Sequence, residues 1–113
     1  MKLIRNKKWI MGESYQKRIL LDSLKGKISL IEDVIVKPKG LIPVHKHDFT
    51  DEIFYINDNS AVMIVNSKEF EVHPGDMIYV GRNEEHGFRN ESDNEFKMIV
   101  SKINFKKGDS YLK

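Results

Sequence analysis

The sequence contains no cysteine, which excludes disulfide bonds and thiolate metal ligands. Any metal bound by this chain must therefore take histidine nitrogen and carboxylate oxygen as its ligands. The chain also has little excess charge, with 19 Lys and Arg against 17 Asp and Glu and a net charge of +2 at pH 7. This balance gives no indication of a nucleic-acid partner or of binding to an anionic membrane.

Long apolar stretches are missing as well, and no run approaches the roughly 20 residues that a membrane-spanning helix needs. Four of the first eight residues are basic, namely Lys2, Arg5, Lys7 and Lys8, and a signal peptide also begins with basic residues. However, Gly12, Glu13 and Ser14 interrupt the apolar stretch that would have to follow. We interpret the basic residues as a solvated terminus, and we expect a cytoplasmic protein without a membrane or nucleic-acid partner.

Turn-forming residues divide the sequence into short runs. Clusters such as Lys37-Pro38-Lys39-Gly40 and Asn57-Asp58-Asn59-Ser60 separate segments rich in Ile, Val and Phe. Many short strands at this spacing predict an all-β sandwich or barrel, and 113 residues predict a single domain over 1–113. The expected strands are 15–21, 28–36, 41–47, 52–56, 61–65, 68–72, 77–80, 86–90 and 96–103. The polar tail 104–113 is expected to lie on the surface.

Three of the four histidines are spaced as metal ligands would be, together with one glutamate. His45 and His47 are two apart, so on a strand both side chains point to the same face. Glu52 follows after a segment that must bend, and it then begins a new strand that can face the same interior. His86 begins a later strand. Three imidazoles and one carboxylate suit one divalent transition metal, namely Mn, Fe, Co, Ni, Cu or Zn.

Taken singly, each of these residues has an ordinary explanation, since a His-x-His pair is usually exposed and a glutamate at a strand start is usually solvated. Their combined spacing, however, resembles the two signature motifs of the cupin family. The first match is Gly40, four residues, His45-x-His47, four residues, Glu52, six residues and Asn59. The second match consists of Gly75, Gly81, Asn83, His86 and Asn90.

The departures from these motifs leave the ligand positions intact. Gly40 is one residue nearer to the histidines than the family pattern has it, and Gly81 replaces a proline. Asn59 and Asn83 replace glycines, and asparagine is the non-glycine residue most tolerant of positive φ. The resemblance implies a double-stranded β-helix, or jelly-roll barrel, that is commonly a homodimer. It also implies a metal held by His45, His47, Glu52 and His86.

The alternation of side chains along each strand indicates what surrounds the site. If Glu52 and His86 point inward, then Phe54, Ile56 and Phe88 do too. In the last strand Lys97 and Ser101 are expected to face outward, which leaves Phe96, Met98 and Val100 facing inward. We expect Phe54, Phe88 and Met98 to form the wall of a substrate pocket. This inward set contains no Lys or Arg, which a sugar-phosphate isomerase would need, and the orientation of Arg18 and Lys27 is left open. His73 is expected on the surface, Asp76 on turn backbone, and Asn90 in a loop that it ties together.

The resemblance leaves the activity open, because cupins include enzymes and binding proteins. The leading hypothesis is a metal-dependent dioxygenase acting on a small organic molecule, since three histidines and one glutamate leave coordination positions free. A second is an isomerase or lyase acting on a small sugar or keto acid. The alternative is a non-catalytic module that binds metal or a small ligand. No side chain is assigned as catalytic, so the metal would have to do most of the chemistry.

Overall fold

The computed structural model describes residues 1, 3–22 and 28–112, and within them the regular secondary structure is β-strand. The strands are β1 (Ile10–Met11), β2 (Tyr15–Leu21), β3 (Ile28–Val36), β4 (Leu41–Lys46), β5 (Asp51–Asp58), β6 (Ala61–Val65), β7 (Lys68–Val72), β8 (Met77–Val80), β9 (His86–Arg89), β10 (Phe96–Ile103) and β11 (Tyr111–Leu112). No helix in the described part of the chain is long and apolar enough to cross a membrane.

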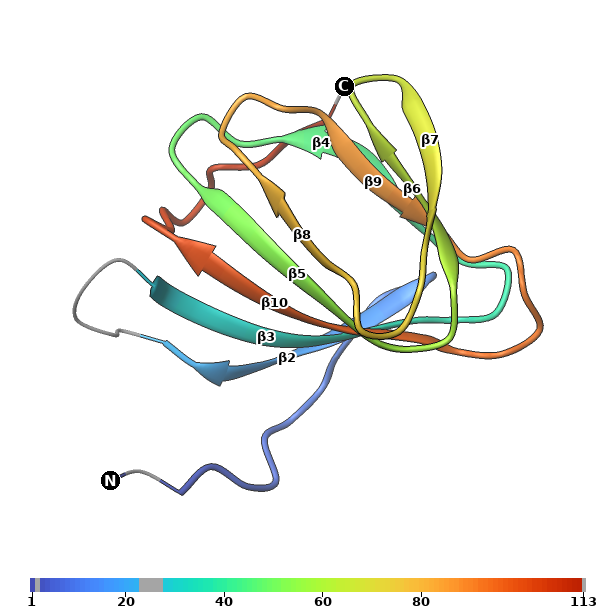
Figure 1. Ribbon diagram of the computed structural model, residues 1–113. Helices are drawn as coiled ribbons and strands as arrows, with labels where there is room; N and C mark the ends of the chain where they lie inside the picture. The colour runs from blue at the N-terminus through green and yellow to red at the C-terminus, as the bar shows by residue number, and fades with distance from the viewer. Residues whose placement is uncertain (2, 23–27, 113) are drawn as a thin grey trace.

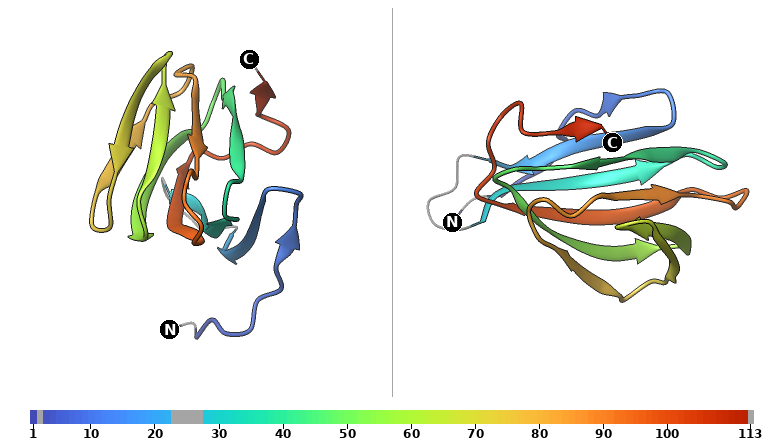
Figure 2. Two further views of the ribbon diagram at one scale, coloured as in Figure 1. Left: turned by 90° about the vertical axis from the view of Figure 1, so that its right-hand side faces the viewer. Right: turned by 90° about the horizontal axis from the view of Figure 1, so that it is seen from above.

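Two antiparallel sheets face each other (Figure 1). One sheet has six strands in the order β1-β2-β3-β10-β5-β8, and the other has five in the order β11-β4-β9-β6-β7. Figure 2 shows from two further sides that the sheets form two layers, while the N-terminal segment extends away from them. The architecture is the jelly roll that the sequence predicts. Neighbours in each sheet are mostly distant in sequence, so the fold brings residues from both halves of the chain together.

The core lies between the sheets and follows the period of two that strands impose on side chains. In β3, every second residue from Leu30 to Val36 is buried, and the residues between them are partly exposed. β10 shows the same alternation at Phe96, Met98 and Val100. The core cluster contains Val34, Val36, Phe54, Ile56, Ala61, Met63, Val72, Val80, Phe88, Phe96, Met98 and Val100. Every inward position predicted from the sequence is therefore confirmed.

The turns also follow the predicted chemistry. Asn59 and Asn83, which stand where the family motifs have glycine, adopt φ of 66° and 68°. Asparagine tolerates this left-handed region because its short amide can bond to nearby backbone, and the side-chain oxygen of Asn59 accepts from the Ser60 amide at 2.8 Å. Both replacements of glycine are thus compatible with the fold.

The predicted strands all form, with ends that differ by at most two residues. The structure adds β1 and β11, which the sequence does not predict because each has only two residues and no alternation to detect. The expectation of a surface tail is wrong in part. β11 pairs with β4, and Asp109 just before it is only 6% exposed.

Candidate metal centre

Four side chains converge between the sheets. His45 lies on β4 directly opposite His86 on β9, in the five-stranded sheet, and His47 follows the end of β4. Glu52 reaches them from β5 in the six-stranded sheet. One ligand atom from each of the four lies within 4.8 Å of the others. The bend between His47 and Glu52, which the sequence requires, is thus the point where the chain passes from one sheet to the other.

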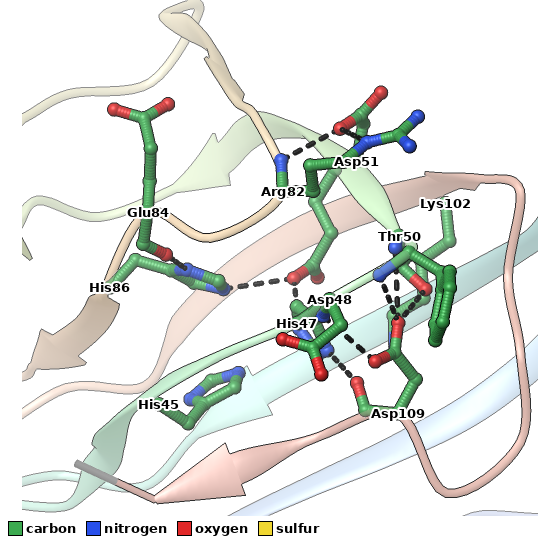
Figure 3. Close-up of polar contacts among 12 residues, drawn as sticks. His45, His47, Asp48, Thr50, Asp51, Arg82, Glu84, His86, Lys102 and Asp109 are labelled. Carbon is green, nitrogen blue, oxygen red and sulfur yellow. Dashed lines mark hydrogen bonds and ion pairs between the residues drawn. The ribbon is translucent and has the colours of Figure 1, made fainter.

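Each of the three imidazoles is held through its Nδ1 atom by a backbone carbonyl. His45 Nδ1 is 2.7 Å from the Pro43 oxygen. His86 Nδ1 is 2.9 Å from the Glu84 oxygen (Figure 3). His47 Nδ1 bonds to the Asp109 oxygen. Because a carbonyl oxygen only accepts, each Nδ1 must carry the proton and donate. In a neutral ring the lone pair is then on Nε2, which leaves three equivalent nitrogens free to bind a metal.

Two of these Nε2 atoms face the same carboxylate oxygen. Oε1 of Glu52 lies 2.6 Å from Nε2 of His47 and 2.8 Å from Nε2 of His86. Among the described residues, His47 Nε2 has no partner with hydrogen-bond geometry despite this short distance. Lone pairs of nitrogen and carboxylate oxygen that face each other repel unless a cation lies between them. The donor set therefore fits a metal ion, with protonated histidine as the other way to balance the charge.

The electrostatics of the centre differ from ligand to ligand. Burial lowers the pKa of His45 to about 4, so this ring stays neutral at physiological pH. Burial also opposes protonation of His47, but the close Glu52 carboxylate outweighs burial and raises the pKa of His47 above its usual value. Burial alone would raise the pKa of Glu52. The close His47 and His86 rings outweigh burial and hold that pKa far below the usual range, so Glu52 is an anion.

Asp109 supports the centre from the C-terminal segment, and the sequence does not predict this role. Its carbonyl orients His47, and its carboxylate accepts from the backbone amides of Asp48 and Phe49, each at 2.8 Å. The same carboxylate accepts from the amide and the hydroxyl of Thr50, each at 3.0 Å (Figure 3). Asp109 thus fixes both the ring of His47 and the bend that leads to Glu52.

We predict that Asp109→Ala lowers metal affinity by about 10- to 100-fold, as loss of supporting residues around a metal site commonly does. The variant keeps all four ligands but removes the anchor of the bend at 48–50. Equilibrium competition with a chelator measures the change. Asp93→Ala is the matched control, because Asp93 is exposed and its ion pair is with Lys39 at 3.5 Å. Equal metal affinity in both variants would contradict the supporting role.

A cavity of about 350 Å³ opens next to the four ligands. Its lining residues include Phe54, Phe88 and Met98, and their role as a substrate-pocket wall stays a prediction. The inward set predicted from the sequence omits Lys17 and Lys102, which also line this cavity. Of the two cations left open, Arg18 pairs with Asp33 at 3.0 Å, and Lys27 lies outside the described residues. Lys102 continues the inward series Phe96, Met98 and Val100 by two residues, but a charged side chain beside an apolar run is usually solvated.

The remaining polar residues lie where the sequence places them. His73 is exposed in the turn after β7, with its side chain 55% accessible. The carboxylate of Asp76 accepts from the His73 amide at 2.8 Å. Asn90 is buried and donates to the carbonyls of Val36, Lys37 and Asn94, so it ties loops together.

Comparison with protein families gives a match to the Cupin domain over residues 32–102. A curated relative is an uncharacterized protein of Methanocaldococcus jannaschii, 29% identical over 75 residues. Those residues are 66% of this chain and 60% of that protein, so the chain spans less than two thirds of the length of this relative.

Three solved structures share the fold over nearly all of the chain. The polyketide cyclase RemF from Streptomyces resistomycificus has a TM-score of 0.84 and 22% identity, covering 99% of this chain and 84% of that one. A predicted oxalate decarboxylase from Thermotoga maritima has a TM-score of 0.81 and 20% identity, covering 92% and 100%. KdgF from a Halomonas species has a TM-score of 0.82 and 15% identity, covering 95% and 96%. Identities this low establish the common fold alone.

Proposed function

The chain belongs to the cupin family, and we propose that it is a metal-dependent enzyme that converts a small organic anion by isomerase or lyase chemistry. His45, His47, Glu52 and His86 would hold one divalent transition metal. The observation that carries the proposal is the arrangement of the three imidazoles, each with Nδ1 bound to a carbonyl and Nε2 directed at one point. A bound metal would act there as a Lewis acid toward a substrate oxygen.

The side chains around the ligands give the site its enclosure. Phe54, Phe88 and Met98 are buried, so they exclude water from the inner wall of the cavity. In such a low-dielectric setting, charge that develops on a substrate interacts strongly with fixed charges nearby. The cavity volume of about 350 Å³ is at the lower end of the range for ligand pockets, so it accommodates a small organic molecule rather than a polymer.

The charged lining favours isomerase or lyase chemistry over the dioxygenase that the sequence put first. Lys102 lies inside the cavity, and a fixed cation there is what an anionic sugar or keto-acid substrate requires. Two proteins with this fold, a polyketide cyclase and a predicted oxalate decarboxylase, are also named for conversions of organic molecules. Turnover of the iron-loaded protein that consumes oxygen would contradict the proposal.

Metal affinity should fall as the pH is lowered from 7 to 5. The metal needs neutral His47, whose pKa is raised by its pairing with Glu52, so a proton must leave that ring before the metal binds. Each bound proton that must leave costs about tenfold in affinity per pH unit below that pKa. His45 adds no competition in this range, because its pKa is about 4. Equilibrium competition with a chelator, corrected for the chelator's own protonation, measures the slope, and a flat profile would contradict the ligand assignment.

The test of function begins with the metal content of the purified protein and with reloading by Mn, Fe, Co, Ni or Zn. Each form is then incubated with small keto acids, hydroxy acids and sugar acids under nitrogen, and products are followed by NMR. Turnover without oxygen supports the proposal. Turnover of the iron form that requires oxygen uptake would establish the dioxygenase instead, and saturable binding without turnover would establish a binding module.

A further inference from the structure

Four charged side chains form a row across the inner face of the six-stranded sheet. Lys17 of β2 lies 3.5 Å from one carboxylate oxygen of Glu32 on β3. Lys102 of β10 lies 3.2 Å from the other oxygen of Glu32. Lys102 is also the direct cross-strand partner of Glu52, the carboxylate of the metal centre. The row alternates in sign, and it connects the ligand cluster to a second charged group in the same cavity.

Stability alone does not explain this row. Glu32 is 4% exposed and the side chain of Lys102 is 12% exposed, so both charges lose most of their hydration on folding. For buried ion pairs this desolvation commonly cancels the attraction between the charges. Apolar side chains would fill the same space at least as favourably. The row is therefore better explained by something that it binds.

Lys102 has capacity to bind a further group. Its ammonium carries three donors, and only one oxygen of Glu32 is within ion-pair distance. The other contact of this ammonium is the ring of Phe105, whose centroid is 5.3 Å away. Within the described residues its remaining donors have no acceptor, and Lys102 lines the cavity. An acceptor supplied by a ligand would complete its hydrogen bonding.

We propose that Lys102, held by Glu32 and supported by Lys17, binds a carboxylate of the substrate. The oxo or hydroxyl oxygen of the same substrate then faces the four ligands. This assignment of substrate class rests on the proposed function. Lys17, Glu32, Lys102 and Glu52 together carry no net charge, and a divalent metal at the four ligands would bring the total to +2, so the metal-loaded site favours an anionic substrate. Cross-strand neighbours such as Lys102 and Glu52 are about 5 Å apart at Cβ, so the two oxygen functions belong to a short-chain oxo or hydroxy acid.

Malonate is the probe for the metal-loaded protein, because it carries two carboxylates one carbon apart. We expect Lys102→Met to keep its metal but to bind malonate at least about tenfold more weakly by calorimetry, as for the loss of one charge-assisted hydrogen bond. Lys102→Arg should retain most of the affinity. Lys97→Met is the matched control, since Lys97 is on the same strand and pairs with Asp58 on the outward side. Equal malonate affinity in the wild type and in Lys102→Met would overturn the subsite.

Glu32→Gln gives an effect of opposite sign that a purely structural role would not produce. It preserves shape but removes the negative charge that competes with the ligand for Lys102, so malonate should bind more tightly than to the wild type. Weaker malonate binding in Glu32→Gln would contradict the proposal. Inorganic phosphate is titrated in parallel, and tighter binding of phosphate than of malonate would overturn the choice of carboxylate.

Acetate binding to the metal-free protein separates this proposal from the proposed function. Acetate should perturb the ammonium NMR signal of Lys102 in the wild type, and Lys97→Met should respond in the same way. If no metal binds but acetate perturbs Lys102, the proposed function fails and the carboxylate subsite stands. If metal binds but the binding of acetate and of malonate does not depend on Lys102, the subsite fails and the metal centre stands.

Discussion

At neutral pH, His47→Ala should bind no transition metal in competition with a weak chelator, while the metal-free variant remains folded. His47 supplies one of the four ligand atoms that lie within 4.8 Å of one another, and alanine offers no replacement. The ring also lies outside the main hydrophobic cluster, so its loss leaves the packing between the sheets in place. Because a ligand that binds only the folded state raises the melting temperature, metal should stabilise the wild type and leave the variant unchanged.

His73→Ala is the matched control for this result. It makes the same substitution at the histidine that the structure places on the surface, where the ring contacts Ser60 and Glu71. Its metal affinity and its stabilisation by metal should equal those of the wild type. Loss of metal in His73→Ala with retention in His47→Ala would refute the ligand assignment. Melting temperatures of the three proteins with and without metal, together with metal analysis after dialysis, give the comparison.

The strands of this protein are predictable from sequence because each has one face toward the core. In β3 and β10 the buried positions recur at every second residue, and a shift of one residue would expose that whole face. Some turns are predictable because the backbone limits which residues fit. Asn59 and Asn83 have positive φ, which few residues other than glycine and asparagine tolerate. β1 and β11 have two residues each, too few for any period to appear.

The four residues of the candidate centre are predictable as a set but not one at a time. His45 and His47 share a strand face by parity, whereas Glu52 comes from the opposite sheet and only the family spacing connects it to them. The structure also shows how the three imidazole rings are oriented, which residue spacing cannot indicate. The carbonyls that hold the three rings belong to Pro43, Glu84 and Asp109, and backbone atoms have no signature in the sequence.

Asp109 and Lys102 are not predicted at the site from the sequence, and the reasons differ. Asp109 is 62 positions from His47, in a polar tail without periodicity, so nothing local indicates that it is buried. Lys102 does continue an inward series, but its charge suggested a solvated position. Its burial becomes understandable only with Glu32 on the neighbouring strand, which supplies the opposite charge. Buried charges are paired charges, and pairing between strands distant in sequence requires the fold.

Phe54→Ala should lower the free energy of unfolding by about 3–5 kcal/mol, the usual cost of truncating a fully buried phenylalanine. The side chain is 3% exposed, and its ring packs edge-on against Phe88 at 5.1 Å between centroids. It also contacts the ring of His86 at 5.8 Å. The loss combines lost burial with the cavity that remains, since both sheets hold the surrounding side chains in place. Urea unfolding of the metal-free proteins measures the cost without a contribution from bound metal.

Phe70→Ala is the matched control, because this phenylalanine of β7 is 41% exposed and the same truncation there should cost about 1 kcal/mol or less. The comparison also decides between two roles for Phe54, which lies in the core cluster and lines the cavity. If the Phe54 ring only borders solvent-filled space, Phe54→Ala should lower the free energy of unfolding little more than Phe70→Ala does. A cost several times larger means that the inner wall of the cavity is the core itself, so that the fold and the candidate site are stabilised by the same side chain.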